Sequence, residues 1–264
     1  MLKVRVIPTL LWKDFGLVKG VGFDSWRRVG TILPAIKVYN TRDVDELILV
    51  EITATSEERE PDYESVADLS AECFVPLTIG GGIRTVEHIT RLLHAGADKV
   101  SINTAAYEKP SLVTEAANRF GAQCIVASID VRRSPDGRYE CYGRSGTTAT
   151  GREPTEWARE LEDRGAGEIL LTSVDRDGTM SGYDLDLIKR VSESVRMPVI
   201  ASGGAGEYQH MLSAVAHGGA SAVAAASIFH FTPKTPLEAK RFLAKNGVAV
   251  RTEKNTNRSV ITES

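Results

Sequence analysis

The chain has 264 residues, of which 42% are hydrophobic and 25% charged, with a formal net charge of −3 at pH 7. This balance is typical of one globular domain and argues against a nucleic-acid partner. No apolar run approaches the roughly 20 residues of a membrane span, and no signal-peptide core opens the chain. We expect a cytoplasmic protein with reduced cysteines and a polar, disordered tail at residues 252–264.

Short runs rich in β-branched residues alternate with longer amphipathic stretches. The predicted strands are residues 4–7, 46–52, 75–79, 99–102, 125–129, 168–172, 199–201 and 222–225. Helical apolar spacing predicts helices within residues 88–95, 111–119, 155–164 and 185–195. The alternation indicates βα units around a parallel sheet, which is either closed or open and doubly wound.

The two halves of the chain repeat one pattern. A glycine cluster at residues 80–82 follows the third predicted strand, and another at residues 203–206 follows the seventh. One helix later, each half continues with Gly-Ala, at residues 96–97 and 219–220. A repeat at half-chain period favours closure, so we predict one (βα)₈ TIM barrel over residues 1–251, built from two similar half-barrels.

The glycine clusters suggest what the barrel binds. Functional residues of such barrels follow the strands, where glycines let backbone N–H groups reach phosphate oxygens. One cluster alone is equally well a tight turn, but two in matching halves predict a ligand with phosphates at both ends. The expected contacts are Gly82, Asn103, Thr104, Asp177, Gly178, Gly204, Ala226 and Ser227.

Two further residues are candidates for catalysis. Asp130 ends the fifth predicted strand, where a carboxyl group can act as general acid or base, although it could instead cap a turn or pair with Arg132 or Arg133. Lys19 lies in a predicted Gly-rich first loop that could close over a substrate.

The histidines do not indicate a metal site. Their spacing includes no ligand pattern with carboxylates, so we predict neither a metal nor a cofactor. Four fall in helical stretches and are expected to be structural or exposed, away from the catalytic face: His88, His94, His210 and His217.

Several long motifs carry a family resemblance. They are 45–47, 52–54, 77–84, 96–106, 165–173, 175–179 and 200–206. From about residue 4 to residue 251 the chain resembles the cyclase subunit of imidazole glycerol phosphate synthase. The resemblance implies a reaction of ammonia with phosphoribulosyl formimino carboxamide ribotide. Its products are imidazole glycerol phosphate, for histidine biosynthesis, and aminoimidazole carboxamide ribotide.

The resemblance also implies a partner. In that family a glutaminase subunit docks on the N-terminal face of the barrel, and ammonia passes through the barrel to the catalytic face. A ring of charged residues gates the entrance, and the matching positions are Arg5, Glu46, Lys99 and Glu168. Alternating charges can equally close a barrel floor as salt bridges.

One position departs from the family pattern. The family has a catalytic aspartate after the first strand, where this chain has Leu11, the half-repeat counterpart of Asp130. A leucine cannot exchange a proton, and Asp14 could substitute only in a rearranged loop. Whether the chain is an enzyme is therefore left open by its sequence.

The departure leaves two hypotheses. The segment 9–16 resembles a diverged subgroup associated with sugar amidation in surface-polysaccharide synthesis, in which the barrel and a glutaminase supply ammonia to a separate sugar amidotransferase. The favoured hypothesis is an ammonia-conducting subunit of this kind. The alternative is a genuine cyclase with altered acid/base chemistry.

Overall fold

The computed structural model describes residues 3–14 and 16–251. The tail for which disorder is predicted lies outside these residues. Eight parallel strands form a ring: β1 (Arg5–Lys13), β4 (Leu47–Glu51), β5 (Leu77–Gly80), β6 (Lys99–Ile102), β7 (Ile125–Arg133), β10 (Glu168–Ser173), β11 (Val199–Ser202) and β12 (Ala222–Ala225). Each pairs with the next, and β12 returns to β1. The predicted (βα)₈ barrel is confirmed, and the open-sheet alternative is wrong.

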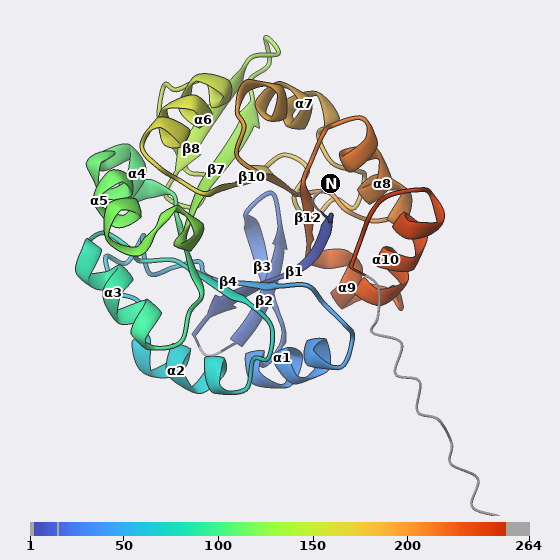
Figure 1. Ribbon diagram of the computed structural model, residues 1–264, viewed down its shortest axis with the longest axis horizontal. Helices are drawn as coiled ribbons and strands as arrows, with labels where there is room; N and C mark the ends of the chain where they lie inside the picture. The colour runs from blue at the N-terminus through green and yellow to red at the C-terminus, as the bar shows by residue number, and fades with distance from the viewer. Residues whose placement is uncertain (1–2, 15, 252–264) are drawn as a thin grey trace, which may run out of the picture.

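Helices surround the ring of strands (Figure 1). They are α1 (Ile32–Asn40), α2 (Tyr63–Ala71), α3 (Val86–His94), α4 (Thr104–Glu108), α5 (Ser111–Phe120), α6 (Pro154–Asp163), α7 (Leu185–Ser194), α8 (Tyr208–Ala216), α9 (Ser227–Phe231) and α10 (Pro236–Lys245), with a 3₁₀ turn η1 (Ala122–Cys124). Several begin at a side chain that accepts a backbone N–H, such as Asp62, Thr85 and Asp184. None of the helices described here has the length and apolar character to cross a bilayer.

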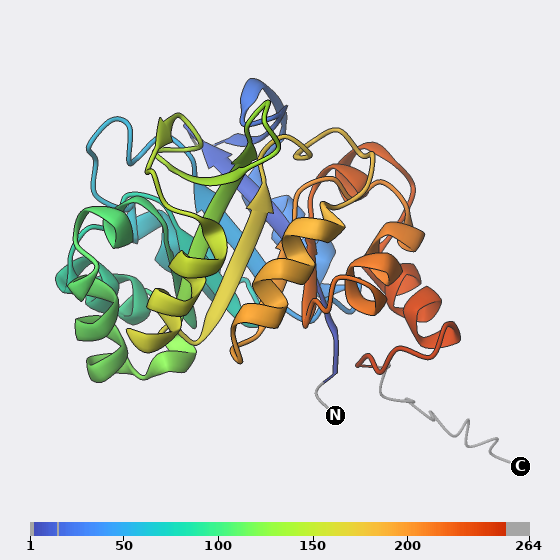
Figure 2. The ribbon, with the colours of Figure 1, turned by 90° about the horizontal axis from the view of Figure 1, so that it is seen from above.

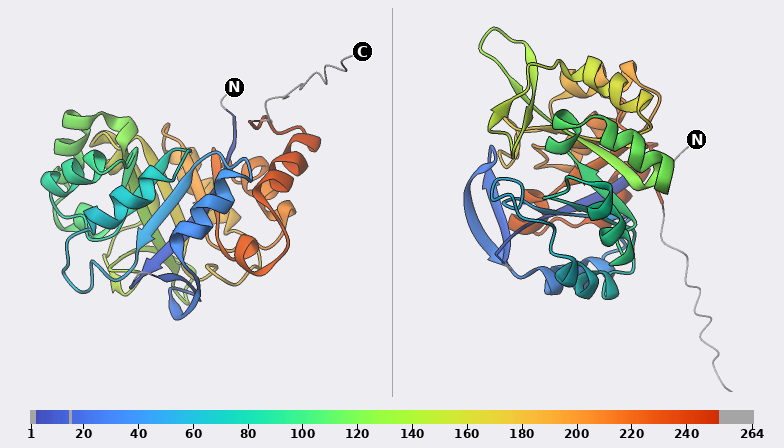
Figure 3. Two further views of the ribbon diagram at one scale, coloured as in Figure 1. Left: turned by 90° about the horizontal axis from the view of Figure 1, so that it is seen from below. Right: turned by 90° about the vertical axis from the view of Figure 1, so that its left-hand side faces the viewer.

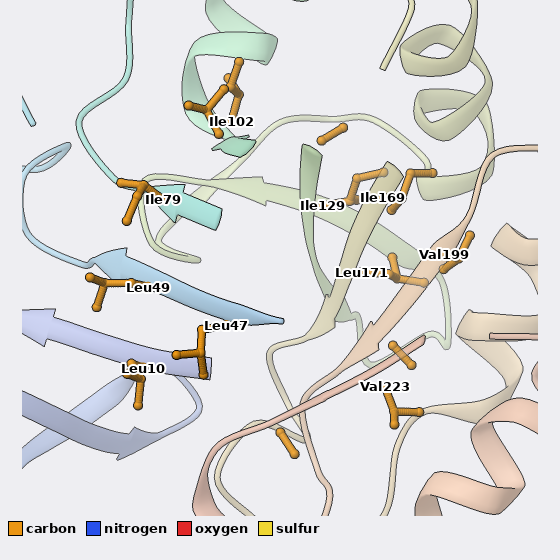
Figure 4. Close-up of a cluster of buried hydrophobic side chains, with 14 of the residues drawn as sticks. Leu10, Leu47, Leu49, Ile79, Ile102, Ile129, Ile169, Leu171, Val199 and Val223 are labelled. Atoms are coloured by element: carbon orange, nitrogen blue, oxygen red, sulfur yellow. The ribbon is translucent and has the colours of Figure 1, made fainter. Parts of the chain in front are cut away.

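The barrel strands separate two apolar layers. Side chains such as Leu10, Leu49 and Ile129 point outward and pack beneath the helices (Figure 4). Alternate residues point inward and form a second cluster inside the barrel: Ile7, Ile48, Val126, Leu170, Ile200, Ala222 and Ala224. Because both faces of the strands are buried, the strands read as near-continuous apolar runs, which is why they were recognisable from sequence.

Two antiparallel hairpins extend the barrel beyond the predicted elements. The first, β2 (Gly16–Val21) and β3 (Asp24–Gly30), continues from β1, and the second, β8 (Tyr139–Gly143) and β9 (Thr148–Ala149), continues from β7. Both rise at the end of the barrel to which the strands point (Figures 2 and 3). The expectation of a Gly-rich loop around Lys19 is therefore wrong, because backbone pairing with β1 and β3 orders that segment as a strand.

Candidate functional site

A cavity lies at the C-terminal ends of the barrel strands, below the β2–β3 hairpin. It encloses about 1180 Å³ of empty space, part of it open to solvent. Every residue expected at the barrel mouth lines it: Leu11, Lys19, Gly82, Asn103, Thr104, Asp130, Asp177, Gly178, Gly204, Ala226 and Ser227. Parallel strands that close into a barrel bring these distant positions together, and the volume has room for a small-molecule ligand.

Asp130 is the buried carboxyl group of this cavity. It lies near the end of β7, and its Oδ2 accepts a hydrogen bond of 3.0 Å from Asn103 Nδ2. Burial, followed by repulsion from Asp177, raises the pKa of Asp130 to about 7. A carboxyl group in this state can hold or release a proton near neutral pH, as a general acid or base requires.

Leu11 occupies the opposite side of the mouth. It lies on the first barrel strand, four strands from Asp130, and pairs with Val50 of β4 and Val18 of β2. Asp14 is exposed at the turn between β1 and β2 and is not among the cavity-lining residues. The mouth therefore has a titratable carboxyl on the Asp130 side and an apolar side chain where a partner carboxyl would face it.

Lys19 joins the hairpin to the cavity wall. Its side chain is 2% exposed, and its Nζ lies 2.6 Å from Asp177 Oδ2. The backbone supports the same contact, since Gly22 N donates to Asp177 O at 2.9 Å. His230 is half-buried nearby, and its desolvation together with the Lys19 charge lowers its pKa to about 4. The cluster therefore has a salt-bridged lysine beside a neutral imidazole.

The two glycine loops have backbone conformations that favour glycine. Gly82 has φ +71° and Gly204 has φ +106°. A Cβ at Gly82 would lie 2.9 Å from Arg59 O, and one at Gly204 only 2.2 Å from Gly182 O. These faces are packed against neighbouring backbone, so glycine is required there. Both glycines also line the cavity without a side chain, which suits close approach of an anion.

The hydroxyl groups at the mouth differ in their bonding. Thr104 Oγ1 accepts from Arg144 N at 2.9 Å. Ser227 is 5% exposed, and its Oγ has no hydrogen-bond partner among the residues that the structure describes. Thr9 Oγ1, which also lines the cavity, is unpartnered in the same way. Buried polar atoms normally have a partner, so these two hydroxyls are groups whose bonding a ligand would complete.

The opposite end of the barrel is closed by charges. Arg5 Nη1 lies 2.7 Å from Glu46 Oε1 and 2.9 Å from Glu168 Oε1, and Lys99 Nζ lies 3.1 Å and 3.3 Å from the same two carboxylates. Burial opposes the charge of Arg5, but attraction to Glu168 and Glu46 outweighs it and raises the Arg5 pKa. The four side chains alternate in sign around one closed ring.

Some site residues were missed from sequence. Phe23 and Trp26 of the first hairpin and Ser145 of the second line the cavity, together with Thr172 and Ser202 at strand ends. The strand-end pair could have been found from the rule that placed Asp130. The hairpin residues could not, because they reach the mouth only through strand pairing that no local motif specifies.

Two of the four helical histidines lie nearer the catalytic face than their sequence positions predict. His88 and His210 lie in the first turns of the helices that follow the two glycine loops, and both rings contact loop backbone. They are therefore near the mouth, because a helix after a barrel strand begins at the catalytic face. In residues 3–14 and 16–251 no group of three His, Cys, Asp or Glu side chains is arranged to hold a metal.

The fold and cavity define a (βα)₈ barrel protein with a cavity at the C-terminal face. Residues 5–234 match the family model described as histidine biosynthesis protein. The chain belongs to this family, and the match covers all eight barrel strands.

Proposed function

We propose that this chain is the barrel subunit of a glutamine amidotransferase. In this proposal a glutaminase partner binds the N-terminal face, and ammonia enters through the charged ring and leaves at the cavity. The acceptor reaction is a sugar amidation performed with a separate amidotransferase. The observation that carries the proposal is the closed ring of Arg5, Glu46, Lys99 and Glu168 at the barrel floor.

The interior above the ring supports a passage for a small neutral molecule. On β1, the inward residues run from Arg5 through Ile7 to Thr9 and Leu11. On β10 they run from Glu168 through Leu170. Ammonia, which is small and uncharged, loses little solvation in such an apolar segment, whereas a charged ammonium ion would lose far more.

Leu11 supports conduction over catalysis. Losing a positioned general acid or base costs about 10²–10⁴-fold in rate, which is roughly 3–5 kcal/mol of transition-state stabilisation. With Asp14 outside the cavity wall, no carboxyl of the first strand takes the place of the missing group. A phosphate-bearing ligand could still bind the glycine loops, so the cavity is better suited to binding than to proton transfer.

The partner interaction gives the direct test. Glutaminase subunits encoded beside the gene for this chain would be purified and mixed with it, and glutamine hydrolysis would be measured with and without the barrel. We expect a complex and a faster hydrolysis. Charge-swapping the exposed Arg138, in the turn between β7 and β8 at the other end of the barrel, is a control and should change neither result. Absence of both complex and stimulation would remove the proposal.

A genuine cyclase is the second candidate, and Asp130 favours it. Its pKa of about 7 and its bond from Asn103 are what a catalytic carboxyl needs. A cyclase assay with ammonium salt separates the two, because it bypasses the glutaminase. We expect little or no turnover from the natural chain and partial recovery in Leu11→Asp. Turnover by the natural chain at about 1 s⁻¹ or more, within the ordinary range of enzymes, would establish the cyclase.

A further inference from the structure

Two histidines occupy equivalent places behind the two glycine loops. His88 is the third residue of α3, and His210 is the third residue of α8. Each follows its loop glycine, Gly82 or Gly204, by six residues. The equivalence suggests one role repeated in the two half-barrels.

His210 is bonded to the end of its loop. Its Nδ1 accepts from Gly206 N at 3.2 Å and from Glu207 N at 3.3 Å. Because a backbone N–H can only donate, this nitrogen must be unprotonated, with the ring proton on Nε2. The same ring lies against Gly182, because a Cβ added at Gly182 would be 3.6 Å from the ring Cδ2. Gly182 in turn contacts the glycine loop, since Gly182 N donates to Gly204 O at 2.8 Å. His210 thus supports the loop from two sides.

His88 makes the corresponding contacts in the first half. Its Nδ1 lies 3.4 Å from Arg84 N and 3.3 Å from Gly82 O. Depending on the tautomer, it accepts from the first or donates to the second. Its Nε2 faces Glu60 Oε1 at 3.8 Å. Either tautomer ties the first turn of α3 to the glycine loop.

These contacts reach beyond ordinary helix capping. In a capping box the third helical residue bonds only the N-cap amide. His88 instead reaches Arg84 and Gly82, which precede the N-cap Thr85, and His210 reaches Gly206 as well as the N-cap Glu207. The rings therefore fix the loops themselves, and an anion site depends on N–H groups that are held in place before the ligand arrives.

We propose that His88 and His210 are positioning residues, each of which holds its own glycine loop in the conformation that binds a ligand phosphate. The inference rests on the proposed phosphate binding by these loops. Neither ring contacts the ligand, and each acts on one loop without the other.

Sulfate is the probe for the test, because its charge does not change near neutral pH. The full chain would be titrated at pH 8, where an ordinary imidazole is neutral, and the backbone amide signals of Gly82 and Gly204 would report each loop separately. We expect His210→Ala to weaken sulfate binding at the Gly204 loop by about three- to tenfold, the equivalent of one net hydrogen bond, and to leave the Gly82 loop unchanged. His88→Ala should give the reverse pattern.

Asparagine variants are the matched controls. Asn places its side-chain oxygen where the imidazole Nδ1 lies, so His210→Asn and His88→Asn should recover most of the affinity. Equal weakening of both loops by either alanine variant would overturn the inference, as would asparagine variants as weak as the alanine ones.

A second measurement keeps the inference separate from the proposed function. If the natural chain bound no sulfate at either loop, phosphate binding itself would be contradicted. Amide hydrogen exchange at Gly206 and Glu207 would then test the positioning directly. Exchange should be faster in His210→Ala and close to natural in His210→Asn, and unchanged exchange in the alanine variant would overturn it.

Discussion

Asp130 couples the stability of the fold to pH. Its pKa is about 7 in the folded protein and about 3.9 in an unfolded chain. Between these values the folded protein holds a proton that the unfolded chain has released, so stability falls as pH rises through this window. Asp130→Asn removes that effect. It should raise the free energy of unfolding by about 1–4 kcal/mol at pH 8 and by little at pH 4.

Urea denaturation of both proteins at the two pH values measures this difference. Asp136→Asn, in the exposed turn between β7 and β8, serves as the control and should show no such gain. A gain in Asp130→Asn that is the same at pH 4 and pH 8 would mean that charge burial is not its cause.

We expect Ser227 to contribute to ligand binding and not to stability. Its buried Oγ has no partner in the described part of the chain, so Ser227→Ala removes an unsatisfied group. The free energy of unfolding should stay the same or rise by up to about 1–2 kcal/mol, while sulfate binding at the Gly204 loop weakens. Thr235→Ala is the contrasting control, because Thr235 accepts from Glu238 N at the start of α10. The free energy of unfolding of Thr235→Ala should be lower by about 0.5–2 kcal/mol. A comparable loss in Ser227→Ala would contradict this account.

At the scale of elements, a buried ion pair links the β2–β3 hairpin to the loop after β10. Lys19→Met leaves the Asp177 carboxylate without its cation, which weakens the attachment of the hairpin to the loop after β10. We expect faster hydrogen exchange at the Gly22 amide, which donates to Asp177 O, and weaker sulfate binding in the cavity. Arg28→Met, an exposed change on β3, is the control. Unchanged exchange at Gly22 would show that backbone pairing alone holds the hairpin.

The elements also show where sequence reasoning succeeds. The barrel strands were predictable because both of their faces are apolar, and the glycine loops because their motif occurs twice. The β2–β3 hairpin was not, since β3 has no alternating apolar pattern and the buried Lys19 finds its partner Asp177 only through the fold. The roles of His88 and His210 were missed for a similar reason. The apolar spacing of the sequence predicts a helix, but it does not show that the first turn of that helix contacts the glycine loop.

At the scale of the whole molecule, the charged ring at the N-terminal end of the barrel joins strands that are far apart in the sequence, and its contribution to stability can be measured. Arg5→Met leaves two carboxylates, Glu46 and Glu168, to share the single ammonium group of Lys99. Because these side chains are only 10–20% exposed, we expect a loss of about 1–3 kcal/mol in the free energy of unfolding.

The loss in Arg5→Met should change little with added salt, since the ring is largely shielded from solvent. Arg138→Met removes an ion pair whose arginine is 84% exposed, and it should change stability by less than about 1 kcal/mol. Urea denaturation at low and high salt measures both variants. Equal losses in the two would mean that the floor contributes no more than a surface pair.

The similarity of the two glycine loops bears on the orientation in which a ligand can bind. For a molecule with a phosphate at each end, the Gly82 loop and the Gly204 loop would be two similar phosphate sites. On loop geometry alone, the molecule could bind in either orientation. The two sides of the mouth differ at one matched position: Asp130 is titratable, whereas Leu11 opposite it is apolar. Because Leu11 and Asp130 do not match, the two half-barrels are not equivalent at the mouth, and we expect a ligand with two phosphates to bind in one orientation.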